Sequence, residues 1–88
     1  MKSIIVSLEA LASAIDKGAD PAKTGEAIKT TRDLTKNYKD ALIRELDTEL
    51  SIWQSKLSVI LKEPVGKQGM AKHARFWAER LKAINTSF

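Results

Sequence analysis

The chain of 88 residues contains no cysteine, which excludes a disulfide framework, a thiolate zinc site and a cysteine nucleophile. This absence also fits a reducing compartment, so we expect a cytoplasmic protein. No apolar run approaches the roughly 20 residues that a membrane-spanning helix needs. The apolar patch near the N-terminus is interrupted by Glu9 and Asp16, too early for the core of a secretory signal. We therefore expect no contact with a membrane.

Only two prolines, Pro21 and Pro64, interrupt the chain, which leaves long stretches free to form helices. The composition, 43% hydrophobic and 30% charged, is typical of a folded protein rather than a disordered one. The length predicts a single helical domain over residues 1–88. Because so short a chain buries a modest core, further burial by self-association would be favourable.

The net charge of +4 is unevenly distributed along the sequence. Nine basic and nine acidic residues cancel within residues 1–61, whereas residues 62–88 carry six basic residues against two acids, Glu63 and Glu79. The positive surplus therefore belongs entirely to the last part of the chain. Such asymmetry permits an acidic partner but does not require one.

The first predicted helix covers about Ser3 to Lys17. Its apolar residues recur at intervals of four and three, as one helix face requires: Ile4, Leu8, Leu11 and Ile15. Gly18 follows as a C-terminal cap, after a cation in the last turn. Asp20 and Pro21 then predict the start of another helix, because Asp caps free N–H groups and Pro is tolerated at the first helical position.

Residues 21–62 are predicted either as one long helix or as two helices broken near Thr30, and we favour the break. Gly25 and several threonines weaken the first part, and Thr30 and Asp33 match a capping box. From Asp33 to Lys62 the helical pattern is the strongest in the chain, with these apolar positions: Tyr38, Leu42, Leu46, Leu50, Trp53, Leu57 and Ile60. Thirty helical residues would extend about 45 Å, beyond the roughly 30 Å of a compact globule of this size.

The last predicted helix begins at about Gln68 or Met70 and ends at Ile84, after a loop at residues 65–69 that follows Pro64. Its apolar stripe has heptad spacing: Met70, Ala74, Trp77, Leu81 and Ile84. A short loop makes this helix and the central one antiparallel neighbours with coiled-coil-like packing. The predicted fold is therefore all-α, a small bundle of three to four helices built on a long antiparallel hairpin. Trp53 and Trp77 are predicted as core anchors.

A second apolar stripe of the predicted central helix lies about 90° away from the first. Its members are Leu34, Ala41, Ile52 and Val59. A helix that borders solvent on one side needs only one stripe, so the second needs a partner of its own. The first and last helices of the chain could cover both stripes, and a second copy of the protein could do so equally well. Because the predicted central helix is so long, we favour a homodimer built partly on the second stripe.

No pattern of residues predicts catalysis, a cofactor or a metal site. His73, the only histidine, lies off the apolar stripe beside Lys72 and Arg75, which indicates an exposed or rim position. Glu45 and Glu49 share a polar seam of the central helix, where the Glu-x-x-His motif of di-iron bundles is absent. We expect this seam to be neutralised by Lys56 or by a cation of the last helix.

The last helix also carries a basic face with one aromatic residue. Its members are Lys67, Lys72, Arg75, Phe76, Arg80 and Lys82. The cations could bind phosphates and Phe76 could stack on a base. The presence of Glu79 and the modest net charge favour a solvated helix face instead, with Phe76 packed at the edge of the core. We therefore expect a non-catalytic protein-interaction or assembly module that self-associates. A nucleic-acid-binding accessory protein that uses this basic face is the alternative.

Overall fold

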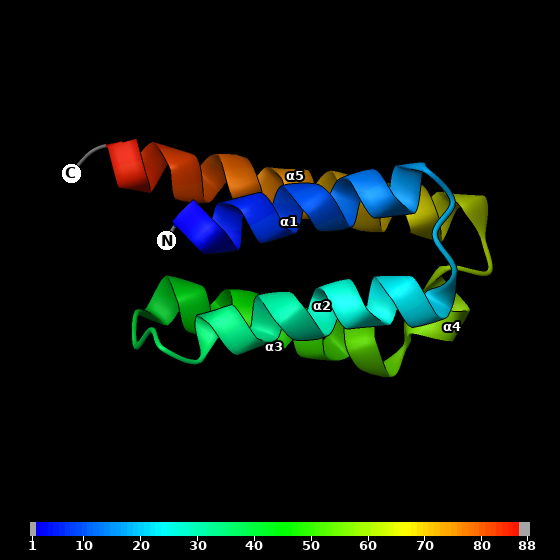
Figure 1. Ribbon diagram of the computed structural model, residues 1–88, viewed down its shortest axis with the longest axis horizontal. Coiled ribbons are helices and arrows are strands. Elements are labelled where there is room, and N and C mark those ends of the chain that lie inside the picture. Colours follow the sequence, from blue (N-terminus) through cyan, green and yellow to red (C-terminus); the bar gives the residue numbers. More distant parts are fainter. Residues whose placement is uncertain (1, 87–88) are drawn as a thin grey trace.

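The computed structural model describes residues 2–86, which form five helices and no strand (Figure 1). In chain order they are α1 (Lys2–Asp16), α2 (Pro21–Thr35), α3 (Ala41–Ser55), α4 (Leu57–Ile60) and α5 (Pro64–Thr86). The predicted all-α bundle is confirmed. No helix among the described residues is both long enough and apolar enough to cross a bilayer.

Each of the four longer helices runs antiparallel to the one before it, with α1 beside α5 and α2 beside α3 (Figure 1). α1 packs most extensively against α5 and, to a lesser extent, against α2. α3 and α5 are antiparallel, as the predicted hairpin requires, but the main partner of α5 is α1. The seams α1–α2 and α3–α5 therefore lie on opposite sides of the molecule.

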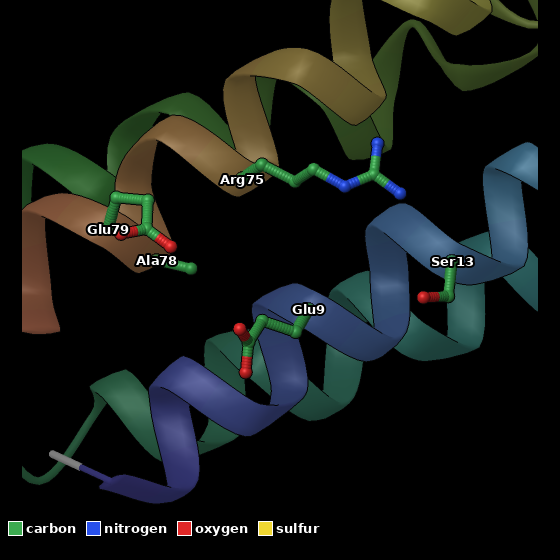
Figure 2. A pocket seen from close by; sticks show the side chains of 5 residues that line it. All are labelled: Glu9, Ser13, Arg75, Ala78 and Glu79. Carbon is green, nitrogen blue, oxygen red and sulfur yellow. The ribbon is translucent and has the colours of Figure 1, made fainter.

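Two ion pairs fix α1 against α5. Arg75 pairs with Asp16, and Lys82 Nζ lies 2.6 Å from Glu9 Oε2. The acids are seven residues apart on α1 and the bases seven apart on α5, so both pairs belong to one antiparallel register. Figure 2 shows Arg75 and Glu79 of α5 on the side of that helix that faces Glu9 of α1.

The predicted caps at Gly18 and Asp20 are confirmed. Gly18 adopts a φ of 79°, and its N–H donates to Ile15 O while Ala19 N–H donates to Ala14 O. This left-handed conformation ends α1 at low cost because glycine lacks a Cβ. Asp20 Oδ1 accepts from Lys23 N at 2.8 Å and begins α2.

The continuous helix predicted from Asp33 to Lys62 is wrong. α2 continues through Thr30, whose hydroxyl donates to Glu26 O instead of capping a new helix, and the chain reverses only at residues 36–40. The reversal allows Arg32 Nε of α2 to donate to Asp47 Oδ1 of α3 at 3.0 Å. A second break follows at Lys56, with φ −112° and ψ 16°.

These breaks also disperse the predicted second apolar stripe. Leu34 lies on α2, Ala41 and Ile52 lie on α3, and Val59 lies on α4. Leu34 is half-buried and the other three are exposed. The argument for a dimer from the length of a 45 Å helix is therefore wrong, whereas a role for these residues in binding stays a prediction.

α5 begins earlier than predicted, at Pro64, so the predicted loop at residues 65–69 is helical. Lys67 N–H already donates to Glu63 O at 3.1 Å. Gly66 makes this start possible, because a Cβ there would lie 2.2 Å from the carbonyl oxygen of Ile60. The glycine therefore permits close approach between α5 and the end of α4, rather than a loop.

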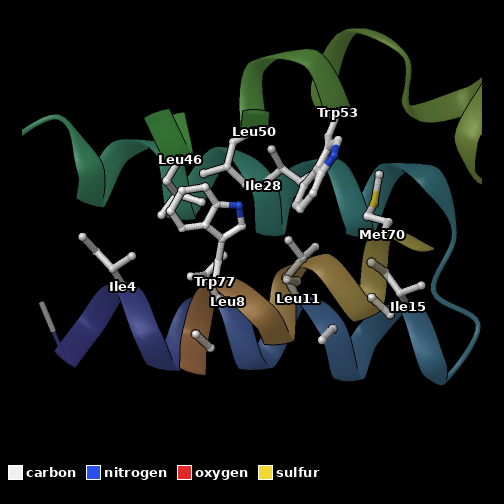
Figure 3. Close-up of a cluster of buried hydrophobic side chains, with 14 of the residues drawn as sticks. Ile4, Leu8, Leu11, Ile15, Ile28, Leu46, Leu50, Trp53, Met70 and Trp77 are labelled. Atoms are coloured by element: carbon white, nitrogen blue, oxygen red, sulfur yellow. The ribbon is translucent and has the colours of Figure 1, made fainter. Parts of the chain in front are cut away.

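The core lies between the two helix pairs and receives side chains from all five helices (Figure 3). Both tryptophans belong to it, as predicted, with Trp53 entering from α3 and Trp77 from α5. α2 contributes an unusual set to this core, in which Ile28 is accompanied by three buried threonines: Thr24, Thr31 and Thr35. Sequence reasoning treated these threonines only as weak helix formers and missed their burial.

Candidate interaction surface

The seam between α3 and α5 is bridged by one carboxylate, that of Glu49. Its Oε1 lies 2.5 Å from His73 Nδ1, and its Oε2 accepts the indole N–H of Trp77 at 2.8 Å. The residue of the last helix that contacts Glu49 is therefore the ring of His73, whereas none of the ion pairs among the described residues joins Glu45 or Glu49 to Lys56 or to a lysine or arginine of the last helix, as the sequence had led us to expect. A carboxylate held by two donors fixes the positions of both rings.

The rings around this carboxylate form a continuous group that we call the aromatic strip: Trp53, His73, Phe76, Trp77 and Arg80. His73 lies edge-on to Trp53 at a centroid distance of 6.3 Å, and 6.1 Å from the ring of Phe76. The guanidinium of Arg80 lies 5.1 Å from the ring centre of Trp77 and 6.0 Å from that of Phe76. These are ordinary distances for aromatic pairs and cation–π contacts.

Two large apolar side chains beside the seam remain in solvent. Phe76 is 55% exposed, and Ile52 of α3 is 50% exposed. Ile52 lies one turn from Glu49, and residues three apart are neighbours on a helix surface. Ile52 therefore lies next to Glu49, on the side of α3 that borders α5. His73 is exposed, in agreement with the predicted rim position.

The predicted basic face does not point in one direction. Arg75 and Lys82 turn towards α1, where Arg75 pairs with Asp16 and Lys82 with Glu9. Lys82 also lies 3.3 Å from Glu79, and these hydrogen bonds to Glu9 and Glu79 raise the pKa of Lys82. Two of the predicted phosphate ligands are thus engaged by acids of the same chain.

The other cations of that face occupy different positions. Lys67 is half-buried near Asp16 and Pro64, at the start of α5. Lys72 is exposed and has no ion pair within residues 2–86. Only Lys72 and Arg80 flank Phe76 on the outer side of α5, one turn before it and one turn after it.

The described helices contain no group of three or more His, Asp or Glu side chains that could hold a metal ion. A charged cleft of about 390 Å³ lies between α1 and α5 (Figure 2). Its lining consists of Glu9, Ser13, Arg75, Ala78 and Glu79. Because Glu9 and Glu79 share Lys82, and Arg75 pairs with Asp16, the charges of this cleft are satisfied within the chain.

A larger groove, which sequence reasoning missed, lies between α1 and α2 and has a volume of about 510 Å³. We call it the α1–α2 groove; it is lined by Lys2, Ser3, Val6, Ser7, Ala10, Thr30 and Leu34. A pattern in the sequence marks the α1 side of this groove. Val6 lies off the apolar stripe of the first helix, and small residues recur beside it.

Comparison with protein-family models, curated protein sequences and solved structures yields no match to this chain. Conclusions about function therefore depend on the residues of the chain itself. Two surfaces are candidates for binding a partner: the aromatic strip with Ile52, and the α1–α2 groove. They lie on opposite sides of the bundle.

Proposed function

We propose that the protein is a non-catalytic interaction module that binds a protein partner through the aromatic strip and Ile52. The exposure of Phe76 and Ile52 beside a fixed seam carries this proposal. Cores of protein interfaces are rich in aromatic residues and Arg, and a few such residues supply most of the binding energy. Phe76 and Arg80 are exposed residues of this kind on one helix, and the guanidinium of Arg80 lies against the buried ring of Trp77.

The side chains of the strip are in contact with one another within the chain. Glu49 holds His73, and Arg80 lies across the rings of Phe76 and Trp77. Side chains that are already held lose less conformational entropy on association, which favours affinity. A second copy of the chain and an unrelated protein are both partners of this class.

Nucleic-acid binding remains the second candidate, because Lys72 and Arg80 flank the exposed ring of Phe76. It has less support, since Arg75 and Lys82 are engaged by acids of α1 and α5. Affinity for nucleic acid depends on the number of phosphates that are neutralised. Lys72 and Arg80 alone, beside one aromatic ring, would give weak binding with a shallow salt dependence.

Site-specific photo-crosslinking in cells tests the proposal. A benzophenone amino acid replaces Phe76 in one variant and Val65, 80% exposed at the start of α5, in the matched control. We expect protein adducts at position 76 that are absent at position 65. Adducts with nucleic acid alone, or equal adducts at the two positions, would contradict the proposal.

Sedimentation of the purified protein then identifies the partner class. A concentration-dependent increase in mass that Phe76→Ala and Ile52→Ala abolish supports a second copy. A monomer at all concentrations, together with protein adducts at position 76, supports a different protein. Duplex DNA that binds at low salt, with loss of binding in Lys72→Glu and Arg80→Glu, would favour the nucleic-acid candidate instead.

A further inference from the structure

The four long helices are packed unevenly around the sides of the bundle. Within residues 2–86, α1 packs closely along α5, α1 along α2, and α2 along α3, whereas α3 and α5 make no comparably close approach of their backbones. The fold therefore consists of two helix pairs, α1 with α5 and α2 with α3. These pairs lie close together on the α1–α2 side and farther apart on the α3–α5 side.

The side chains between the helices explain this difference. On the α1–α2 side, Ser7 Oγ and Thr31 Oγ1 share a hydrogen bond of 2.5 Å, and side chains this short allow two helix backbones to approach closely. On the α3–α5 side, the two tryptophans of the chain, Trp53 and Trp77, enter the core from opposite helices (Figure 3). Because two indole rings need more space than two hydroxyl groups, the layer between the helix pairs is wider at the α3–α5 seam.

Glu49 makes direct polar contacts across this wider seam. Its carboxylate oxygens lie 2.5 Å from His73 Nδ1 and 2.8 Å from Trp77 Nε1, both on α5. The side chain of Glu49 is 26% exposed and that of His73 is 58% exposed, so water can compete for the contact between them. We call these three residues, Glu49, His73 and Trp77, the Glu49 latch.

The two helix pairs are held together more firmly than the seam between them. α1 and α5 are joined by close packing and two ion pairs, and α2 and α3 by close packing and the hydrogen bonds of Arg32. The chain connects α3 to α5 through α4 and residues 61–63, at one end of the seam only. A motion that separates α3 from α5 and keeps both pairs intact therefore breaks the fewest close contacts.

We propose that the bundle opens at the α3–α5 seam, with the α1–α2 side as the hinge, and that the Glu49 latch sets the population of the open form. The two helix pairs stay intact, and the closed form predominates. Such sub-global openings are minor states of a native protein, with a free energy below that of complete unfolding. Opening exposes the indole rings of Trp53 and Trp77, which are 7% and 4% exposed in the closed form.

The open form extends the surface that a partner can bind. The ring of Trp53 contacts His73, which in turn contacts the exposed ring of Phe76. A partner that binds Phe76 and also contacts the newly exposed indoles binds the open form better and raises its population. This consequence rests on the proposed function, whereas the opening is a property of the free protein and is tested without a partner.

Thiol labelling of the full chain tests the opening, because the sequence contains no cysteine. Ala74→Cys places a thiol at a fully buried position one turn before Trp77, beside the seam. The matched control is Ala71→Cys, at a position only 2% exposed and one turn before Arg75, which pairs with Asp16 of α1. Each thiol is protected in the closed form, so its rate of reaction with a small disulfide reagent in native buffer reports how often it becomes accessible.

We expect the thiol at position 74 to react at least tenfold faster than the thiol at position 71, after correction for the stability of each variant in urea. Hydrogen exchange in the natural chain gives a check that needs no variant. The indole N–H of Trp77 should exchange at least tenfold faster than the slowest amides of α1, which open only on global unfolding.

Two further substitutions, each made in both cysteine variants, separate opening from global unfolding. Ala10→Gly weakens α1 at an exposed position, and α1 stays helical in the open form. It should speed labelling about two- to fivefold at position 71 and leave position 74 unchanged. Glu49→Ala removes the latch and should speed labelling at position 74 at least fivefold. Glu45→Ala, at an exposed glutamate one turn earlier on α3, is its control and should have no effect.

Equal rates at positions 74 and 71, or acceleration of both by Ala10→Gly, would overturn the proposal, because the core would then become accessible only on global unfolding. An unchanged rate at position 74 in Glu49→Ala would overturn the role of the latch. The photo-crosslinks at position 76 test the proposed function separately, so the failure of one proposal is distinguishable from the failure of the other.

Discussion

The indole N–H of Trp77 donates to Glu49 Oε2 at 2.8 Å, and the same carboxylate contacts His73 through its other oxygen. This arrangement connects α5 to α3, although α5 packs mainly against α1. The side chain of Glu49 is only 26% exposed, so these two donors replace much of the water that would otherwise solvate its carboxylate. The carboxylate thus joins the two sides of the proposed binding surface.

Replacing Glu49 by Ala should lower the free energy of unfolding by about 1–3 kcal/mol, because the buried indole N–H would lose its acceptor. Glu45→Ala is the control, since Glu45 is an exposed glutamate on the same side of α3. Its effect should stay within about 0.5 kcal/mol. Urea unfolding followed by tryptophan fluorescence measures both. Similar losses for the two variants would show that the Trp77 hydrogen bond does not stabilise the fold.

The buried threonines of α2 should respond in opposite directions to the same substitution. Thr24 Oγ1 is buried without a hydrogen-bond partner among the described residues, whereas Thr31 bonds to Ala27 and Ser7. Thr24→Val removes an unsatisfied hydroxyl and should stabilise the protein by about 1 kcal/mol. Thr31→Val should destabilise it by a similar amount. Thermal unfolding of both variants checks this, and a loss of stability in Thr24→Val would contradict it.

Alanine substitution at the two glycines of α5, Gly66 and Gly69, should change stability in opposite directions. In Gly66→Ala the new Cβ would collide with the backbone of Ile60, so we expect the free energy of unfolding to fall by about 1–3 kcal/mol. A Cβ at Gly69 meets nothing within 4 Å, so Gly69→Ala should raise stability by about 0.5–1 kcal/mol through helix propensity. Chemical denaturation of the pair measures the difference. Equal effects would argue against the close approach at Gly66.

The ion pairs of Lys82 predict a dependence of stability on alkaline pH. Hydrogen bonds to Glu9 and Glu79 raise the folded-state pKa of Lys82 above its ordinary value of 10.5. The stabilisation is therefore complete below that value and is lost as the pH rises through the folded-state pKa. Melting temperatures of the natural chain and Lys82→Met should converge above about pH 10.5.

Lys72→Met is the control for this effect, because Lys72 is exposed and has no ion pair in residues 2–86. Its melting temperature should follow that of the natural chain across the same pH range. If the melting temperature of Lys82→Met differed from that of the natural chain by the same amount at every pH, the carboxylate pairs would have no role in stability.

The sequence predicted those features that depend on local chemistry. Gly18 and Asp20 mark a helix end and a helix start because a left-handed glycine and a capping carboxylate act on adjacent residues. The turn at residues 36–40 has no glycine or proline to mark it. It forms because α2 and α3 bury their apolar faces together and because Arg32 reaches Asp47, which is a property of the packed bundle.

The candidate site was predicted only in part for the same reason. The sequence pattern places Phe76 and Arg80 on one helix, as an aromatic residue and a cation. Their neighbours could not be inferred, because Glu49 and His73 are 24 residues apart and meet only when α5 lies beside α3. The sequence pattern marks Ile52 as an extra apolar residue but groups it with Leu34 and Val59, which lie on other helices.

The pairing of α1 with α5 has a consequence for how the chain folds. The ion pairs between these helices join residues 59 and 73 positions apart, so the bundle is closed by contacts that span most of the sequence. α2 and α3 can pair as a local hairpin, but α1 lacks its main partner until α5 has been synthesised. Individual helices should therefore form within microseconds, whereas closure of the bundle is the slow, cooperative step of folding. Shortened chains that lack α5 would expose the apolar face of α1 and aggregate.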